Sequence, residues 1–213
     1  MIKITKNKEP KEWTAYRTTP GVDYQAIPKL VDALLKEQGY LCAYCMRRVP
    51  CKDKITNEDH HVEHILSREV HDDKKLDYSN MVICCPGHIG DEDHCDRSKQ
   101  SQDVSFNLFD AHFISTLFYK TNGELVSTNE QYNVEINKVL NLNTPLLKEN
   151  RKKVWEGVKQ SLIKTHGNQP WRKPVLEKCL GKYKSMKSRD GKLQYTPYCG
   201  IVIYFLEKKI RQL

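Results

Sequence analysis

The sequence predicts an α+β protein that is mostly helical, with a small strand-loop-strand-helix unit at residues 41–105. Three observations lead to this fold class. Segments with apolar residues at helical spacing flank the unit on both sides. Within the unit, short stretches alternate apolar and polar residues as strands do, and cysteines cluster beside them. We therefore expect three parts: an N-terminal helical segment (1–40), the small unit, and a hairpin followed by a basic helical region (106–213).

Helices are expected where apolar spacing and end signals agree. Residues 23–39 carry an apolar stripe that ends at a glycine, a typical C-terminal cap. Residues 143–167 begin with a Thr-Pro pair that suits the N-cap and the first helical position, and they also end at glycine. Residues 195–213 repeat the Thr-Pro start and predict a last helix with an apolar face. Between these two helices, the loop at 185–192 is expected to be exposed.

Strands are expected in three places. Residues 60–66 alternate apolar and polar side chains, and residues 74–85 read as a loop that leads into a second strand. Residues 95–100 then resemble the start of a helix. Residues 113–128 contain two apolar runs around an Asn-Gly pair, which is a strong hairpin signal.

The composition, 38% hydrophobic and 29% charged, suits one compact domain or one with a small appendage. No segment approaches the ~20 apolar residues that cross a membrane, so we expect no membrane association. The basic N-terminal residues precede no apolar run, which argues against a secretion signal. The expected compartment is therefore the cytoplasm.

The net charge of +8 is unevenly distributed along the chain. Residues 148–213 carry 17 Lys and Arg against 5 Asp and Glu, a net +12, whereas residues 1–147 carry a net −4. Such asymmetry fits either a solvated helical surface or a surface that follows nucleic acid phosphates. The charge alone does not decide between them.

Among the eight cysteines, the clustered ones are interpreted as metal ligands rather than as disulfides, because the cytosol is reducing. Cys42 and Cys45 form a Cys-x-x-Cys turn, which supplies two of the four tetrahedral ligands of a structural Zn²⁺. Cys85 and Cys95 are the favoured second pair, with His88 as the alternative to Cys95 because Cys85-Pro-Gly-His88 also has a suitable short spacing.

Between the two cysteine clusters lies the pair Glu63-His64. Phosphodiester hydrolysis needs a base to activate water and a cation at the scissile phosphate. Histidine is suited to take a proton near neutral pH, and carboxylates are natural ligands of Mg²⁺. Neighbouring strand residues point to opposite faces, so the two side chains would flank a substrate at a twisted strand end.

The order of Cys-x-x-Cys, "VEHIL", "YSNMVICC" and "CDRSK" resembles the HNH endonucleases. The resemblance implies a zinc-stapled ββα-metal (His-Me finger) core with flanking helices. It implies that His64 is the general base and that Glu63 and Asp96 bind catalytic Mg²⁺ or Mn²⁺. Asn80 would orient the base or steady the loop. Two departures are the stretched second cysteine pair and an Asp where the family has Asn or His.

The N-terminal "MIKITKNKEPKEW" and the later "VLNLNTPLLKENR" extend the resemblance to the HNH nuclease subunits of the Septu anti-phage defence systems, including retron-linked versions. This subgroup implies an ABC/SMC-like ATPase as partner. In retron-linked versions it also implies a reverse transcriptase with its RNA-DNA product.

Two functions are thus open at the level of sequence. The first is an HNH endonuclease acting on DNA, or on RNA such as tRNA. The second is a non-catalytic zinc knuckle that binds nucleic acid or protein, in which Glu63 and His64 are a buried polar pair.

Overall fold

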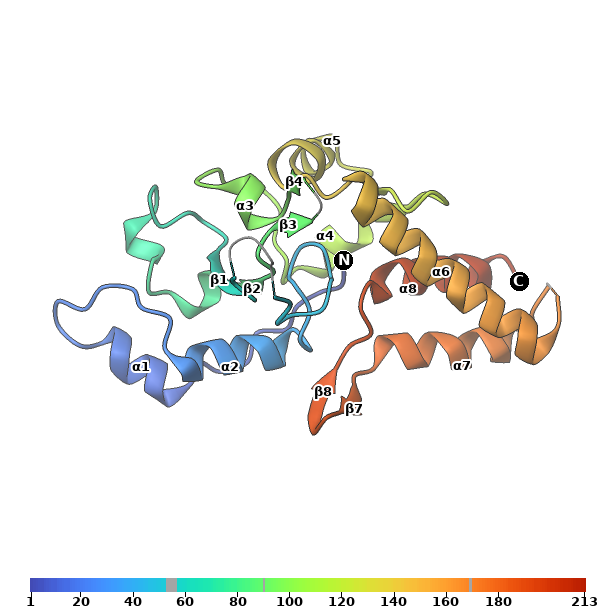
Figure 1. Ribbon diagram of the computed structural model, residues 1–213, viewed down its shortest axis with the longest axis horizontal. Coiled ribbons are helices and arrows are strands. Elements are labelled where there is room, and N and C mark those ends of the chain that lie inside the picture. Colours follow the sequence, from blue (N-terminus) through green and yellow to red (C-terminus); the bar gives the residue numbers. More distant parts are fainter. Residues whose placement is uncertain (53–56, 90, 169) are drawn as a thin grey trace.

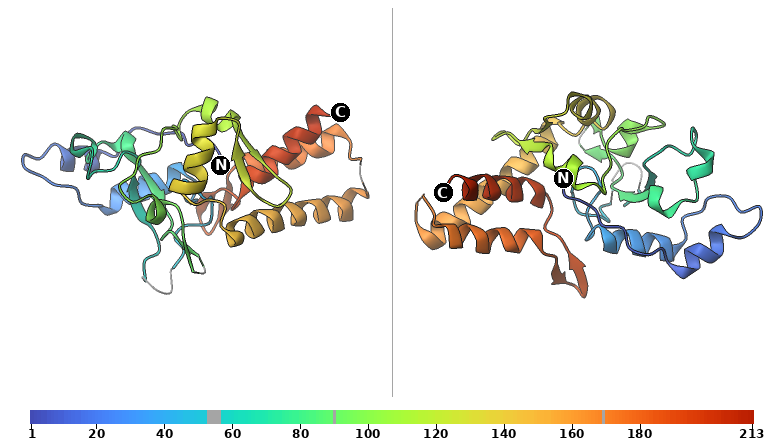
Figure 2. Two further views of the ribbon diagram at one scale, coloured as in Figure 1. Left: turned by 90° about the horizontal axis from the view of Figure 1, so that it is seen from above. Right: turned by 180° about the vertical axis from the view of Figure 1, so that it is seen from behind.

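The fold is α+β, as the sequence predicts, and the strands of the described residues form four separate two-stranded antiparallel sheets. In Figure 1 the short elements gather at one end of an elongated molecule, and three longer helices form an arm at the other. The two views of Figure 2 show the same division. The structure is a computed structural model that describes residues 1–52, 57–89, 91–168 and 170–213.

Two helices open the chain, α1 (Lys11–Arg17) and α2 (Pro28–Glu37). The sequence predicts the second and misses the first. Leu30 and Leu34 bury the apolar face of α2. Gly39 follows with φ +55°, the left-handed conformation that lets the chain leave a helix and that glycine adopts without strain.

The C-terminal end of α2 is fastened to the small unit by two buried polar side chains. The carboxylate of Glu37 accepts a hydrogen bond from Tyr78 at 2.6 Å and pairs with the ammonium of Lys6 at 3.0 Å. The amide of Gln38 exchanges two hydrogen bonds with the backbone of Ile83, at 2.7 and 2.8 Å. The side chain of Gln38 thus pairs with the backbone of the strand that contains Ile83, as a neighbouring strand would.

The small unit is built on the antiparallel pair β1 (His61–His64) and β2 (Met81–Cys84), with Glu63 opposite Val82. All four residues of β2 are buried. The expected strands are both present, and the expected helix start at residues 95–100 is one short turn. The remaining elements of this unit are η1 (Asp72–Lys74), η2 (Tyr78–Asn80), β3 (His88–Ile89), β4 (Glu92–Asp93) and α3 (Asp96–Lys99).

The expected hairpin is present as β5 (Leu117–Tyr119) and β6 (Leu125–Ser127). Gly123 in its turn has φ +87°, and a Cβ there would lie 2.0 Å from the carbonyl oxygen of Lys148, so only glycine fits. The hairpin is flanked by α4 (Ala111–Ser115) and by α5 (Glu130–Val134), which continues into a π-helical turn, η3 (Glu135–Val139).

The arm consists of α6 (Pro145–His166), α7 (Lys173–Lys184) and α8 (Cys199–Arg211). The start of α6 follows the prediction, because the hydroxyl of Thr144 accepts a hydrogen bond from the amide of Leu147. The sequence pattern does not predict α7. The start of α8 is later than its Thr-Pro pair suggests, because Tyr198 adopts a left-handed conformation before the helix.

The loop expected at 185–192 is exposed, and it forms a short hairpin of β7 (Lys187–Arg189) and β8 (Lys192–Gln194). The core of the arm lies between α6 and α8, where Trp155 stacks on Phe205 with ring centroids 5.0 Å apart. The apolar face of α8 is therefore used inside the chain.

The arm is joined to the small unit by backbone hydrogen bonds just before α8. The amide of Tyr195 donates to Gly39, and that of Tyr198 donates to Met46, each at 3.0 Å. One buried apolar cluster contains residues from all three predicted parts of the chain. The boundaries expected near residues 40 and 105 stay a prediction.

Among the helices of the described residues, none has the length and hydropathy that a membrane span requires.

The buried guanidinium of Arg151 offers a test of how the arm is attached. It donates to the carbonyls of Gly123 and Leu142 and to the side chain of Asn143, at 2.6, 2.8 and 2.8 Å. We expect Arg151→Met to lower the free energy of unfolding by about 3 kcal/mol, because these buried acceptors lose their donor. Urea denaturation followed by circular dichroism measures this. Lys152→Met, an exposed neighbour, is the matched control, and equal effects of the two changes would contradict the assignment.

Candidate functional site

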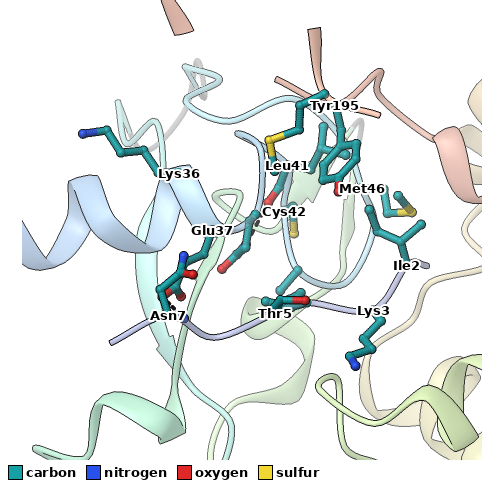
Figure 3. Close-up of a pocket in the computed structure, with 14 residues that line it drawn as sticks. Ile2, Lys3, Thr5, Asn7, Lys36, Glu37, Leu41, Cys42, Met46 and Tyr195 are labelled. Atoms are coloured by element: carbon teal, nitrogen blue, oxygen red, sulfur yellow. Dashed lines mark hydrogen bonds between the residues drawn. The ribbon is translucent and has the colours of Figure 1, made fainter. Parts of the chain in front are cut away.

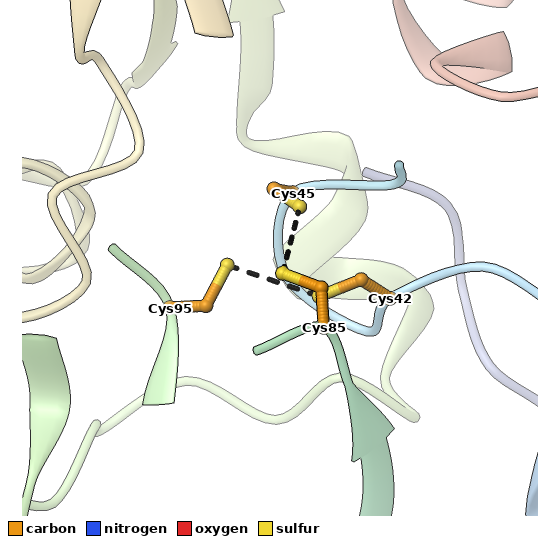
Figure 4. A group of neighbouring side chains, drawn as sticks. All are labelled: Cys42, Cys45, Cys85 and Cys95. Atoms are coloured by element: carbon orange, nitrogen blue, oxygen red, sulfur yellow. Dashed lines mark hydrogen bonds between the residues drawn. The ribbon is translucent and has the colours of Figure 1, made fainter. Parts of the chain in front are cut away.

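Four cysteine sulfurs converge at the centre of the small unit (Figure 4). Cys42 and Cys45 come from the turn after α2, Cys85 follows β2, and Cys95 precedes α3. The sulfur atoms all lie within 4.8 Å of one another, and two of the separations are 3.8 Å (Cys42–Cys95) and 3.7 Å (Cys45–Cys85). A tetrahedral Zn²⁺ with Zn–S bonds of about 2.3 Å requires sulfurs about 3.8 Å apart. The four thiols therefore fit a zinc ion.

Local backbone contacts bring the ligands together. The amide of Met46 donates to the carbonyl of Cys42 at 3.1 Å, which closes the Cys-x-x-Cys turn. The amide of Ala43 donates to Ile83 of β2 at 3.0 Å, so the turn lies against the strand that leads to Cys85. The sequence supplies the ligands, and the β2 edge places the two pairs next to each other.

The fourth member of the group is Cys95, whereas the alternative His88 is not part of it. Nδ1 of His88 instead lies 2.9 Å from a carboxylate oxygen of Asp93. Nδ1 of His94 lies 3.0 Å from the sulfur of Cys95, where an N–H would stabilise a thiolate. The inserted segment 86–94 thus loops out from the group and returns the chain to it; Gly90 in this insert lies outside the described residues.

The thiol of Cys42 illustrates the electrostatics of this group. Burial raises its pKa, but hydrogen bonds with the neighbouring cysteines lower it more, so the pKa lies well below its usual value. A thiolate is the form that binds zinc.

Beside the sulfur group lies a cluster of buried charged side chains. The carboxylate oxygen Oε1 of Glu63 lies 2.9 Å from the ammonium of Lys99 and accepts a hydrogen bond from the hydroxyl of Tyr44 at 3.1 Å. Lys99 has no exposed surface, and it also donates to the backbone carbonyl of His64 at 3.2 Å. The contacts with Lys99 and Tyr44 both use Oε1, and the carboxyl group of Glu63 also contacts that of Asp96.

Asp96, at the first position of α3, adds a second carboxylate to the cluster. Burial and the neighbouring Asp96 raise the pKa of Glu63 well above its usual value, although Lys99 acts in the opposite direction. Burial opposes ionisation of Asp96 too, but contacts with His61 and Glu63 lower its pKa to about 2. Two neighbouring carboxylates favour a cation beside them, and in this cluster the ammonium of Lys99 lies against Glu63.

His64 is held by its ring nitrogen Nε2, which lies 3.0 Å from the backbone carbonyl of Lys75. A carbonyl only accepts, so Nε2 carries the hydrogen and Nδ1 of the neutral ring keeps its lone pair. Burial lowers the pKa of His64, which favours the neutral ring at pH 7. The ring of Tyr24, from the loop before α2, packs edge-on against the imidazole of His64, with the ring centroids 4.6 Å apart.

Asn80 binds the loop between β1 and β2, and its side-chain hydrogen bonds go to that loop rather than to the His64 ring. Its amide nitrogen donates to the carbonyls of Leu66 and Lys74, at 2.9 and 3.2 Å. Its amide oxygen accepts from the amide of Leu66 at 2.8 Å. Because Lys75 follows Lys74, Asn80 also holds the segment whose carbonyl orients His64. The geometry therefore favours the loop-steadying role over a direct hydrogen bond to the base.

Glu63, His64 and Asp96 all line one pocket of about 280 Å³. They come from β1 and from α3, which are more than 30 residues apart in the sequence. Two arginines lie in the same wall and give it positive charge. The lining residues are Val62, Glu63, His64, Ser67, Arg68, Glu69, Asp96, Arg97 and Gln100.

Sequence reasoning missed several members of this cluster. His61 lies 2.7 Å from the Asp96 carboxylate, and it lies two residues before Glu63 on β1, hence on the same strand face. That period of two was the available signal. Lys99 lies one helical turn after Asp96, but its burial against Glu63 depends on tertiary packing. No spacing or motif in the sequence points to Arg68.

A second cavity, of about 220 Å³, lies on the other side of the Cys-x-x-Cys turn (Figure 3). The N-terminal segment, the end of α2 and Tyr195 enclose it. Its buried acid, Glu37, is already engaged by Lys6 and Tyr78. The described residues that line this cavity include no other carboxylate and no histidine, so the pocket of His64 is the better candidate for chemistry.

No model of a known protein family matches this chain, and no curated protein matches it either.

Replacing a single sulfur tests the zinc site. We expect Cys95→Ser to lose the metal from a protein that otherwise holds about one zinc per chain. The melting temperature should fall by about 10 °C or more, because metal binding contributes to folding free energy. Atomic emission and thermal melting with and without a chelator measure both effects. Cys179→Ser is the control, a half-buried cysteine outside the group. Equal zinc content in both variants would contradict the site.

Proposed function

We propose that the protein is a metal-dependent HNH endonuclease that hydrolyses phosphodiester bonds of nucleic acid. The observation that carries the proposal is that Glu63, His64 and Asp96 line one pocket next to a four-sulfur group. The order β1, β2, α3 also agrees with the ββα-metal arrangement that the sequence resemblance implies. The pocket thus combines a neutral imidazole with two carboxylates.

In this proposal, Glu63 and Asp96 would hold Mg²⁺ or Mn²⁺, and a Zn²⁺ ion on the four sulfurs would stabilise the unit. When bound, the divalent ion would neutralise charge on a non-bridging phosphate oxygen and on the leaving 3′ oxygen. His61 keeps the Asp96 carboxylate in place through their 2.7 Å contact. Lys99 and Tyr44 keep Glu63 in place through Oε1.

His64 serves as the general base. The carbonyl of Lys75 holds the proton on Nε2, so Nδ1 receives the proton of the attacking water. The lowered pKa keeps the ring neutral at physiological pH. Asn80 acts on the base indirectly, through the loop that it binds, and is a positioning residue.

The substrate is a polynucleotide whose phosphates contact the arginines of the pocket, Arg68 and Arg97. We expect a 5′-phosphate product, because the carboxylates would hold the cation at the 3′ leaving oxygen. The chemistry needs no particular sugar, so DNA and RNA such as tRNA both remain candidates.

The biological setting rests on the sequence resemblance alone. It is an anti-phage defence complex with an ABC/SMC-like ATPase, joined in retron-linked versions by a reverse transcriptase and its RNA-DNA product. The ATPase would restrain or position the nuclease until a trigger arrives.

A non-catalytic zinc module is the second candidate. It is favoured by the buried contacts of Glu63 with Lys99 and Tyr44, since a purely structural acid would be paired in this way.

Replacement of His64 separates the two candidates. A nuclease should lose at least about 100-fold in cleavage rate in His64→Ala, because the general base is gone, and keep its zinc and its fold. If Glu63 and His64 are only a structural polar pair, His64→Ala should instead lower the stability of the protein. Cleavage of labelled DNA and RNA with Mg²⁺ or Mn²⁺ measures the rate, and zinc content and thermal melting check the fold. His112→Ala, an exposed histidine outside the pocket, is the control.

The substrate class is tested in cells. The ends of cellular DNA and RNA would be sequenced after induction of the protein with its neighbouring genes, beside the His64→Ala variant. New ends that carry 5′-phosphates and depend on His64 are expected. Ends with 3′-phosphates would contradict the assigned roles.

A further inference from the structure

A groove of about 710 Å³ runs along the arm between α6 and α7. Its lining residues come from these two helices and from Lys187 of β7, and none of them belongs to the pocket of His64. On α6 the lining extends from Lys153 to His166, a distance of about 20 Å at 1.5 Å per residue. The groove is thus long enough for several turns of a helix.

The groove has an apolar floor and a basic rim. Val154, Val158 and Leu162 of α6 recur at helical spacing along the floor, and Val175 and Tyr183 of α7 face them. The exposed rim carries Lys153, Lys178, Lys182 and Lys187, and the residues that line the groove in the described chain include no carboxylate. Lys153 has a 3.4 Å contact with Glu149, which lies outside the lining.

The packing of the arm leaves this side open. α7 packs along α8, and α6 reaches α8 through the stacked Trp155 and Phe205, whereas α6 and α7 make little contact with each other. α8 lies behind α6 in Figure 1 and in front of it in the rear view of Figure 2. α8 contributes nothing to the lining. A helix docked in the groove would complete a four-helix arrangement around the apolar floor.

The glycine at position 157 is independent evidence that the groove accommodates a partner. It lies in the middle of the 22-residue α6, where glycine destabilises a helix relative to alanine. Its φ is ordinary, and a Cβ added to it would meet no atom within 4 Å, so no contact inside the chain requires glycine. Since Gly157 lines the groove, its missing side chain leaves room for close approach of another backbone.

We propose that this groove binds an acidic amphipathic α-helix of a partner protein. The helix would bury its apolar face on the valine and leucine floor and place Asp and Glu against the lysine rim. A nucleic acid backbone would match the lysines but would leave the apolar floor without a partner. A symmetric contact with a second copy would bring two lysine rims together. The inference does not depend on the nuclease proposal.

The test uses the full chain and a fluorescein-labelled helical peptide of about 18 residues, with Leu on one face and Glu on the others. A scrambled peptide of equal composition and a peptide with Lys in place of Glu are the peptide controls. Fluorescence anisotropy measures each affinity, and a single-stranded oligonucleotide is added as competitor. We expect the acidic amphipathic peptide to bind at least about tenfold more tightly than either control.

The chain supplies a matched pair of variants. Gly157→Trp fills the groove, whereas Gly181→Trp adds the same side chain at an exposed position of α7 outside the lining, where a Cβ also meets open space. We expect Gly157→Trp to weaken peptide binding at least about tenfold and Gly181→Trp to leave it unchanged. Circular dichroism and zinc content check that both variants fold. Lys178→Glu, on the exposed rim, should lower the affinity for the acidic peptide while leaving the apolar residues of the groove unchanged.

Three results would overturn the proposal. Equal binding of the scrambled peptide would show that charge alone attracts it. An unchanged affinity in Gly157→Trp would place the peptide elsewhere. Displacement of the peptide by the oligonucleotide, together with weaker oligonucleotide binding in Gly157→Trp, would assign the groove to nucleic acid.

Discussion

The convergence of four sulfurs on one point is the constraint on which the small unit depends. Cys42 and Cys95 are separated by 53 positions in the sequence, and their sulfurs lie 3.8 Å apart. The unit has only short strands and a single turn of helix, which supply little cohesion of their own. A metal that binds all four sulfurs would offset the entropy of closing this long loop. It would also hold Asp96, the residue after Cys95, beside β1.

That position explains why charged side chains are buried next to the sulfur group. Glu63 and Lys99 are buried together, with the partly exposed Asp96 beside them, although desolvation of charges is expensive. Pairing with Lys99 and His61 reduces the desolvation penalty of the two carboxylates. Apolar side chains of similar size would nevertheless stabilise the fold at least as well. Such clusters are found where a protein needs a perturbed acid or a cation, which is the reason for placing the proposed chemistry here.

The arm is stabilised by different means. Apolar packing around Trp155 and a buried guanidinium, Arg151, attach its helices, and backbone hydrogen bonds from Tyr195 and Tyr198 join it to the Cys-x-x-Cys turn. The turn is therefore shared between the two ends of the molecule. If the groove binds a partner helix, α8 and this turn would connect the groove to the pocket of His64. The arrangement offers a physical route between the two surfaces.

The sequence by itself determined the Cys42–Cys45 turn and Cys85 as members of the sulfur group, the strands at His61 and Met81, the Asn-Gly hairpin and the start of α6. These features depend on local rules such as ligand spacing, side-chain alternation, turn chemistry and capping. Only the tertiary structure decided that Cys95 rather than His88 completes the sulfur group, that Lys99 and His61 join the carboxylates, and that α7 leaves a groove beside α6. Each of those results depends on contacts between segments distant in the chain, and one-dimensional spacing carries no information about such contacts.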